Sequence, residues 1–130
     1  LETGGGVVKA LPLLGPDPFF VVNTDVTWVT AGDGTYHQLA DAWRGERMDA
    51  LLLLAAMERT LGFRGPGDFF LSADGQLERR GQREQAPYVF AGSYITCADR
   101  LTGYRAEPFS ANLYWNAFAA RGRLMGTVMT

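Results

Sequence analysis

The fold class turns on one apolar stretch near the middle of the chain, Met48-Asp49-Ala50-Leu51-Leu52-Leu53-Leu54-Ala55-Ala56-Met57. Leu and Ala favour a helix by propensity, but a short apolar run that follows a helix is also typical of a strand in a parallel sheet. The preceding segment, 36–47, has apolar residues at the i, i+3, i+4, i+7 spacing of a helix. We therefore predict a strand over 48–57, with helix 36–47 as the crossover of a βαβ unit.

The segments before this unit also carry a helix pattern and a strand pattern. The sequence predicts a short helix over 7–14, stopped by Pro12 and Gly15, and then a strand over 19–23. That strand, Phe19-Phe20-Val21-Val22-Asn23, is a continuous apolar run, which is typical of a strand buried on both faces.

The segments after it predict a mixed sheet. The turn Ala73-Asp74-Gly75 separates two β-prone runs, 69–72 and 76–79, and so predicts a β-hairpin. The remaining elements are a strand over 87–96 interrupted by Gly92, a helix over 110–121, and a strand that begins at Leu124. We expect Ser110 to be the N-cap of the helix and Gly122 to end it. The fold class is therefore α/β, and the hairpin makes the sheet mixed rather than purely parallel.

The charge balance disfavours a dedicated nucleic-acid binder. The 130 residues include 12 basic and 14 acidic side chains, a net charge of −2, and no basic run is present. The single cysteine, Cys97, and the single histidine, His37, exclude a disulfide framework, a cysteine-rich zinc site and a cluster of histidines. We interpret Cys97 as a small buried side chain and His37 as an exposed or helix-capping residue.

The apolar runs and the two ends predict where the protein resides and that it is longer than this sequence. No apolar run reaches the roughly 18 residues that a membrane span needs, and no cationic segment precedes an apolar one as in a leader. We therefore expect a cytoplasmic protein without a membrane partner. Because the sequence starts at Leu1 within an apparent functional loop and stops at the start of a strand, we expect it to be the middle of a longer protein.

Four features of the sequence could bind a ligand. Thr3-Gly4-Gly5-Gly6 precedes a predicted helix, where free backbone N–H groups can receive an anion or a carbonyl, although a plain glycine-rich turn is equally consistent. Asn23-Thr24-Asp25 follows the apolar strand, and its carboxylate could hold Mg²⁺ or simply form an Asx-turn. Gly92 either lets a ligand approach the strand or marks a bulge. Glu84 either accepts hydrogen bonds from a hydroxylated substrate or is a surface charge.

Together and in this order, these features resemble one known family. The two stretches that carry the resemblance are Leu1-Glu2-Thr3-Gly4-Gly5-Gly6-Val7-Val8-Lys9-Ala10-Leu11-Pro12-Leu13-Leu14-Gly15 and Pro18-Phe19-Phe20-Val21-Val22-Asn23-Thr24-Asp25-Val26. They look like the centre of bacterial sugar-1-phosphate nucleotidyltransferases, most closely the N-acetylmuramate-1-phosphate uridylyltransferase branch, whose members are often labelled mannose-1-phosphate guanylyltransferase. Later stretches support this: Gly67-Asp68-Phe69-Phe70-Leu71, Phe90-Ala91-Gly92, and Phe109-Ser110 leading a helix to Arg121-Gly122-Arg123-Leu124.

The resemblance implies a fold, a reaction and a set of site residues. The fold would be a Rossmann-like nucleotidyltransferase fold with a mixed central sheet, and residues 1–130 would be part of that single domain. The reaction would transfer a nucleotidyl group from an NTP, UTP or GTP, to a sugar 1-phosphate, giving an NDP-sugar and pyrophosphate with Mg²⁺ as the cofactor. The implied residues are Glu2, Thr3, Gly4, Gly5 and Gly6 for the nucleotide, Asp25 for Mg²⁺, and Asn23, Gly67, Asp68, Glu84 and Gly92 for the sugar.

The sequence departs from the family pattern in two respects. Thr24 stands where the Asn-x-Asp motif usually has Gly. The family's triphosphate-binding loop, with an Arg and a Lys, and its closing strand with a second acidic metal ligand are not found in these 130 residues. We therefore expect the fold to be incomplete at both ends, the 130-residue chain alone to be inactive, and the full-length protein to be the enzyme.

Two other interpretations stay open at this point. A non-catalytic sugar-nucleotide-binding or regulatory relative would keep the fold and lose the reaction, and an unrelated small α/β interaction domain would have neither. An incomplete sheet would also leave an apolar edge at strand 19–23 or its neighbour, so we expect poor solubility of the isolated residues 1–130. The choice of base, the choice of sugar and the oligomeric state are not specified by the sequence.

Overall fold

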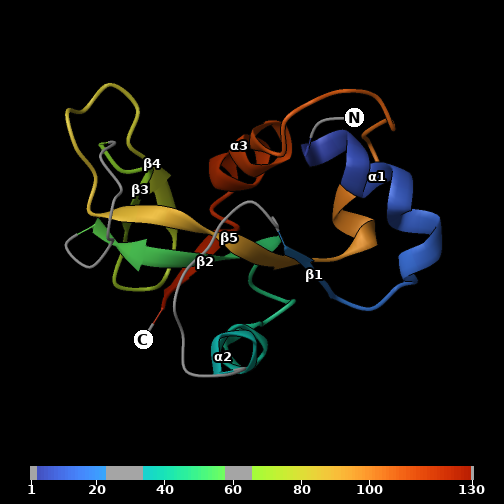
Figure 1. Ribbon diagram of the computed structural model, residues 1–130, viewed down its shortest axis with the longest axis horizontal. Coiled ribbons are helices and arrows are strands. Elements are labelled where there is room, and N and C mark those ends of the chain that lie inside the picture. The colour runs from blue at the N-terminus through green and yellow to red at the C-terminus, as the bar shows by residue number, and fades with distance from the viewer. Residues whose placement is uncertain (1–2, 23–33, 58–65, 130) are drawn as a thin grey trace.

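The computed structural model describes residues 3–22, 34–57 and 66–129, which form a mixed β-sheet with helices on both faces (Figure 1). The central strand is β5 (Tyr88–Thr96). One side of it pairs antiparallel with β2 (Ala50–Ala56), and the other side pairs antiparallel with β3 (Phe69–Leu71) at its start and β1 (Phe19–Val22) at its end. β4 (Leu77–Arg79) extends the sheet beyond β3, and β6 (Leu124–Val128) runs parallel to β2. The predicted mixed α/β fold is confirmed.

The helices cover the two faces unequally. Helices α1 (Thr3–Leu14) and α3 (Asn112–Ala120) lie on one face, and α2 (Gly34–Ala42) lies on the other (Figure 1). A short 3₁₀ helix, η2 (Ala98–Leu101), follows β5. No helix among these described residues is long and apolar enough to cross a membrane.

Strand β2 is the core of the molecule, as the apolar run predicted. Leu52 and Leu54 pack into the cluster beneath α1 and α3, and Leu51 and Leu53 pack into the cluster beneath α2. All four side chains are almost fully buried. Because successive side chains of a strand point to opposite faces, a run of leucines is the pattern that a strand buried on both sides requires.

Helix α1 begins four residues earlier than predicted and ends at Leu14, as predicted. It begins at Thr3, so the glycine run is the first turn of the helix and not a loop before it. The backbone N–H groups of Gly4 and Gly5 both donate to the carbonyl of Phe109, at 2.9 and 3.3 Å, which satisfies donors that a helix start leaves free. Pro12 lies inside the helix instead of stopping it, and Gly15, with a φ of 73°, follows the last helical residue.

Three other expectations were wrong in detail. β1 is partly buried on one face and exposed on the other, where Phe20 and Val22 are 44% and 45% exposed. Helix α2 ends at Ala42, where the Arg44 guanidinium donates to the carbonyl of Asp41 in the last turn. The N-cap of α3 is Ala111 and not Ser110, although the Ser110 hydroxyl accepts the N–H of Asn112 at 3.2 Å. The remaining strands, the hairpin and the stop at Gly122 (φ 70°) are confirmed.

Candidate functional site

The carboxyl ends of β1 and β2 point in the same direction, because both strands run antiparallel to β5. This is the edge at which α/β sheets bind ligands. β1 ends at Val22, which is opposite Ser93, the residue after Gly92. The predicted metal ligand Asp25 and its neighbour Asn23 follow β1 in the sequence and lie outside the described residues, as does Glu2. Their roles stay predictions.

Gly92 lies at a bulge in the central strand. Its φ is 97°, a conformation that favours glycine, and the pairing of β2 with β5 shifts register there. Leu52 is opposite Tyr94 while Leu54 is opposite Phe90, so β5 has extra residues around Gly92. The bulge that the sequence left as an alternative therefore exists, and the sugar contact of Gly92 stays a prediction.

Gly67 and Asp68 directly precede β3 and lie beside the start of β5, where the N–H of Asp68 donates to the carbonyl of Tyr88. A Cβ atom at Gly67, whose φ is 84°, would meet the carbonyl oxygen of Ala86 at 2.2 Å, so only glycine fits. The Asp68 carboxylate accepts the N–H of Phe90 at 3.0 Å, two residues before Gly92. Asp68 thus bonds to β5 two residues before Gly92, and Gly67 packs against Ala86, while the sugar contacts of both residues stay predictions.

A cavity of about 410 Å³ lies at the carboxyl end of β2. It is lined by Ala56, Met57, Gln85, Ala86, Pro87 and Tyr88. Glu84 is exposed and directly precedes this lining segment. The structure therefore brings the segment of Glu84, the loop of Gly67 and the start of β5 to one end of the sheet, and the sugar contact of Glu84 stays a prediction.

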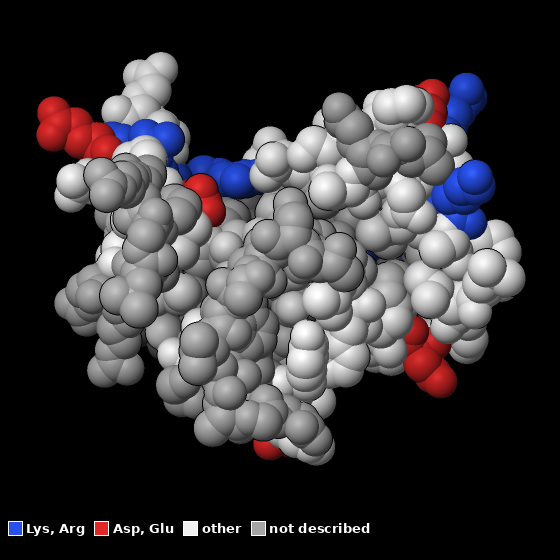
Figure 2. Space-filling model, in the orientation of Figure 1, with Lys and Arg blue, Asp and Glu red and all other residues white. Residues whose placement is uncertain are grey.

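The hairpin is tied to α3 by an arginine that the sequence did not single out. The Arg79 guanidinium donates to the side-chain oxygens of Asn112 and Asn116, and it lies 5.0 Å from the centre of the Phe69 ring. Figure 2 shows a notch between the segment that follows β4 and the lobe that contains α1 and α3, with basic side chains along its floor. The notch lies on the face of the sheet that carries α3.

The predicted nucleotide-binding run packs against the start of α3. The Thr3 hydroxyl accepts the N–H of Ala111 at 2.9 Å. Gly4 is buried, and a Cβ atom there would meet the Phe109 ring at 2.2 Å, whereas a Cβ atom at Gly6 would meet nothing within 4 Å. The N–H groups of Gly4 and Gly5 already donate to the carbonyl of Phe109. Gly6, in contrast, has open space beside its Cα atom.

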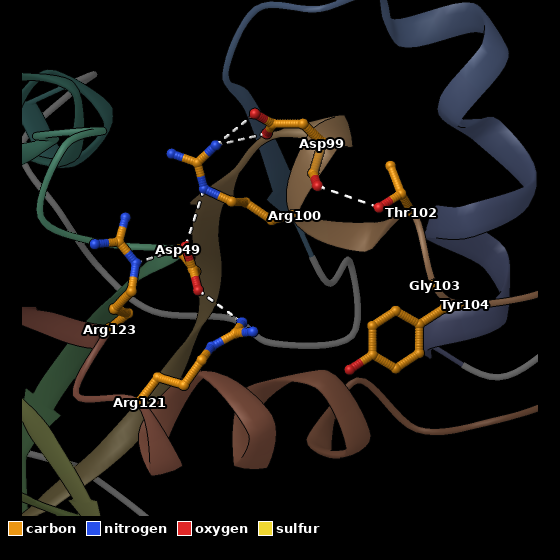
Figure 3. Close-up of a pocket in the computed structure, with 8 residues that line it drawn as sticks. All are labelled: Asp49, Asp99, Arg100, Thr102, Gly103, Tyr104, Arg121 and Arg123. Atoms are coloured by element: carbon orange, nitrogen blue, oxygen red, sulfur yellow. Dashed lines mark hydrogen bonds and ion pairs between the residues drawn. The ribbon is translucent and has the colours of Figure 1, made fainter.

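A second, more polar cavity of about 680 Å³ lies at the opposite end of the sheet (Figure 3). Its centre is Asp49, which precedes β2 and is 3% exposed. The Asp49 carboxylate accepts hydrogen bonds from Arg121 and Arg123, both at 2.8 Å, and pairs with Arg100 at 3.0 Å. The other residues that line the cavity are Asp99, Thr102, Gly103 and Tyr104.

This network is explained by the packing of the chain. The remaining nitrogens of Arg123 donate to the carbonyls of Gly45, Glu46 and Met48, and Arg100 donates to Gly45 and Asp99. The guanidinium groups of Arg100 and Arg123 therefore connect η2 and the residue before β6 to the turn before β2. Sequence reasoning missed the network, but Asp49 gave a signal, because a charge within an apolar strand needs a partner.

Two buried tyrosines and the buried cysteine favour their neutral forms. The Tyr94 and Tyr114 hydroxyls bond to each other beneath α3, and burial raises the pKa of Tyr114 to about 12 and that of Tyr94 further. Burial also raises the pKa of the Cys97 thiol, which confirms its interpretation as a buried side chain. His37 is exposed. Within the described ranges, no three His, Cys, Asp or Glu residues are grouped to hold a metal ion.

Comparison with known proteins identifies close relatives of the sequence. The N-acetylmuramate alpha-1-phosphate uridylyltransferase of Caulobacter vibrioides is 43% identical over 127 residues. The match covers 97% of this chain and 52% of the relative, so the chain spans about half of that protein's length. No family model matches the chain.

Solved structures agree on the fold. HddC from Yersinia pseudotuberculosis complexed with GMP-PN matches with a TM-score of 0.71 and 18% identity, over 99% of this chain and 54% of the other. The inositol-1-phosphate CTP transferase from T. maritima also matches with a TM-score of 0.71, at 10% identity, over 98% of this chain and 52% of the other. Over nearly all its length, this chain is therefore similar in sequence to a sugar-1-phosphate nucleotidyltransferase, as its motifs predicted, and it has the mixed α/β fold of the two solved structures.

Proposed function

We propose that the full-length protein is a sugar-1-phosphate nucleotidyltransferase, which converts an NTP and a sugar 1-phosphate to an NDP-sugar and pyrophosphate. The single observation that carries this proposal is the 43% identity over 97% of the chain to an N-acetylmuramate alpha-1-phosphate uridylyltransferase. The relative's name favours UTP and N-acetylmuramate 1-phosphate as the substrates. GTP with mannose 1-phosphate is the second pair to test.

The reaction needs no nucleophilic side chain. A phosphate oxygen of the sugar 1-phosphate attacks the α-phosphorus of the NTP, and a new P–O bond forms in line with the bond that breaks. The electron pair of the broken bond leaves with pyrophosphate. This chemistry agrees with a chain whose one cysteine is buried and whose one histidine is exposed.

Binding and positioning would then be the task of this chain's residues. Glu2 to Gly6 would contact the base and ribose, with Gly6 offering the open backbone, and Asn23, Gly67, Asp68, Glu84 and Gly92 would contact or position the sugar. Two structural contacts support the second assignment. Asp68 holds the N–H of Phe90 beside Gly92, and Gly67 packs on Ala86 next to the cavity below Glu84.

Mg²⁺ is the cofactor that the resemblance implies, with Asp25 as its ligand. The donor set suits the ion, because Mg²⁺ prefers carboxylate oxygens and leaves room for substrate phosphates. When bound, it would offset negative charge on the phosphates. The described residues offer no rival carboxylate cluster, which leaves the end of β1 as the place to test.

A pyrophosphate-release assay on the full-length protein, with Mg²⁺ and either UTP or GTP, tests the proposal. We expect release that requires both the NTP and the sugar 1-phosphate. Asp25→Ala should lower it by at least about a hundredfold, the scale of losing an electrostatic contact to the reacting phosphates, while circular dichroism shows an intact fold.

Asp17→Ala is the matched control, because Asp17 is an exposed carboxylate before the same strand and should keep full activity. Retained turnover in Asp25→Ala would refute the metal assignment. No release by the unmodified protein with any substrate pair would favour the non-catalytic relative, which no observation favours now.

A further inference from the structure

Trp115 carries a buried hydrogen-bond donor that pairs with none of the residues that the structure describes. Its side chain is 6% exposed, and its indole Nε1 has no hydrogen-bond partner among the described residues. The other buried nitrogen without a hydrogen bond, Nε of Arg100, lies 3.0 Å from the Asp49 carboxylate and is compensated by that ion pair. Folded proteins leave few buried donors unsatisfied, so each one needs a specific explanation.

The indole lies over the part of β5 that contains Gly92. Its ring centre is 4.9 Å from that of Phe90 and 5.2 Å from that of Tyr94, the aromatic residues two positions before and after Gly92. Helix α3, which carries Trp115, lies above β5 in Figure 1. The indole ring therefore packs against the two aromatic side chains that flank the strand position predicted to receive the sugar.

None of the side chains whose rings or guanidinium group lie beside the indole accepts a hydrogen bond from its N–H. Phe90 has no oxygen or nitrogen in its side chain. The Tyr94 hydroxyl is already bonded to the Tyr114 hydroxyl. Arg79, whose guanidinium lies 5.9 Å from the indole ring centre, has only donors. An acceptor for the Trp115 N–H must therefore come from outside this cluster.

We propose that Trp115 contacts the sugar substrate and that its indole N–H donates a hydrogen bond to an oxygen of the sugar 1-phosphate. This inference rests on the proposed function and adds a residue on α3 to the predicted sugar site on β5. A site built to bond a substrate oxygen discriminates strongly against substrates that lack it, because the buried donor is then left unpaired. Trp115 is thus a specificity-determining residue.

The test compares Trp115→Phe with Trp43→Phe in the full-length protein. Phe keeps an apolar ring and removes the N–H, and Trp43 packs on the α2 face of the sheet, so its replacement is the matched control. We expect Trp115→Phe to raise KM for the sugar 1-phosphate about tenfold, the loss of one hydrogen bond, with KM for the NTP unchanged. Trp43→Phe should leave both values unchanged.

Equal KM values for the sugar 1-phosphate in the two variants and the unmodified protein would overturn the inference. If the unmodified protein releases no pyrophosphate, the proposed function itself fails, so the two failures are distinct. If Trp115→Phe fails to fold, the NMR chemical shift of the Trp115 indole ¹⁵N–¹H signal in the unmodified protein tests the contact instead. N-acetylmuramate 1-phosphate should shift it and inorganic phosphate should not, and no shift with the sugar 1-phosphate would refute the contact.

Discussion

Replacing Asp49 with Asn should destabilise the protein more than any change to the arginines around it. The Asp49 carboxylate receives three guanidinium contacts, from Arg100, Arg121 and Arg123, and is buried. An Asn oxygen at the position of Oδ1 can keep the contacts of Arg100 and Arg123, but the amide N–H₂ at the position of Oδ2 then faces the Arg121 donor. The variant Asp49→Asn therefore loses the Arg121 contact, keeps the other two only as bonds to a neutral oxygen, and leaves partly buried cations without their counter-ion.

The expected loss is about 3 kcal/mol. Hydrogen bonds to charged groups contribute about 1.5–3 kcal/mol each, and the low end applies because Arg121 is 59% exposed and solvent screens its charge. About 1.5 kcal/mol for the lost Arg121 contact and a similar amount for the weakening of the other two contacts give this value, which is also the low end for breaking a buried ion pair. With a urea m-value of about 2 kcal/mol per M, the unfolding midpoint should fall by about 1.5 M.

Urea unfolding followed by tryptophan fluorescence measures this shift. Arg121→Gln is the matched control, because it removes one exposed partner and should lower stability by less than about 1 kcal/mol. If Asp49→Asn lowers the free energy of unfolding no more than Arg121→Gln does, the carboxylate is not the centre of the network, and the account of this cavity is wrong.

Two further predictions concern the glycine run and the tyrosine pair. Gly4→Ala should lower the free energy of unfolding by about 1–3 kcal/mol, because its Cβ overlaps the Phe109 ring. Gly6→Ala should raise the free energy of unfolding by up to about 1 kcal/mol, since its Cβ meets open space on a helix. Thermal unfolding of both variants tests this, and equal changes in stability would contradict the packing of Gly4 on Phe109. The folded protein holds the Tyr114 proton more tightly than the unfolded chain, so stability is complete below the ordinary pKa of 10.0 and falls as the pH rises toward about 12. The slope, up to about 1.4 kcal/mol per pH unit, should be smaller in Tyr114→Phe, and identical midpoints of both proteins from pH 9 to 12 would refute this.

The order and type of the elements could be predicted because each depends on local patterns. The leucines of β2 alternate between two buried faces, and the turn at Gly75, whose φ is 91°, needs the glycine that the sequence supplies. These signals lie within a few residues of one another. The prediction failed where distant parts of the chain decide the structure.

Helix α1 shows such a tertiary effect. Three glycines and Pro12 give this segment a low helix propensity, but the Phe109 carbonyl satisfies the N–H groups of Gly4 and Gly5, and Val7 and Leu11 pack on the core. The partners of Asp49 likewise come from three later segments.

The candidate site was predicted in part. The motif residues Gly67, Asp68 and Gly92 do lie near one another, because Asp68 bonds to the strand that contains Gly92. Arg79 and Trp115 carry no local signal in the sequence, since their importance arises from contacts between the hairpin, α3 and β5 that only the fold creates. Asn23 and Asp25 stay predictions.

The most direct test of the central claim is mass spectrometry of the product that the full-length protein makes from N-acetylmuramate 1-phosphate in an equal mixture of UTP and GTP with Mg²⁺. The account predicts UDP-N-acetylmuramate as the main product, together with pyrophosphate in equal amount. If no nucleotide sugar forms from this mixture, and none forms when mannose 1-phosphate replaces N-acetylmuramate 1-phosphate, the assignment as a sugar-1-phosphate nucleotidyltransferase is contradicted.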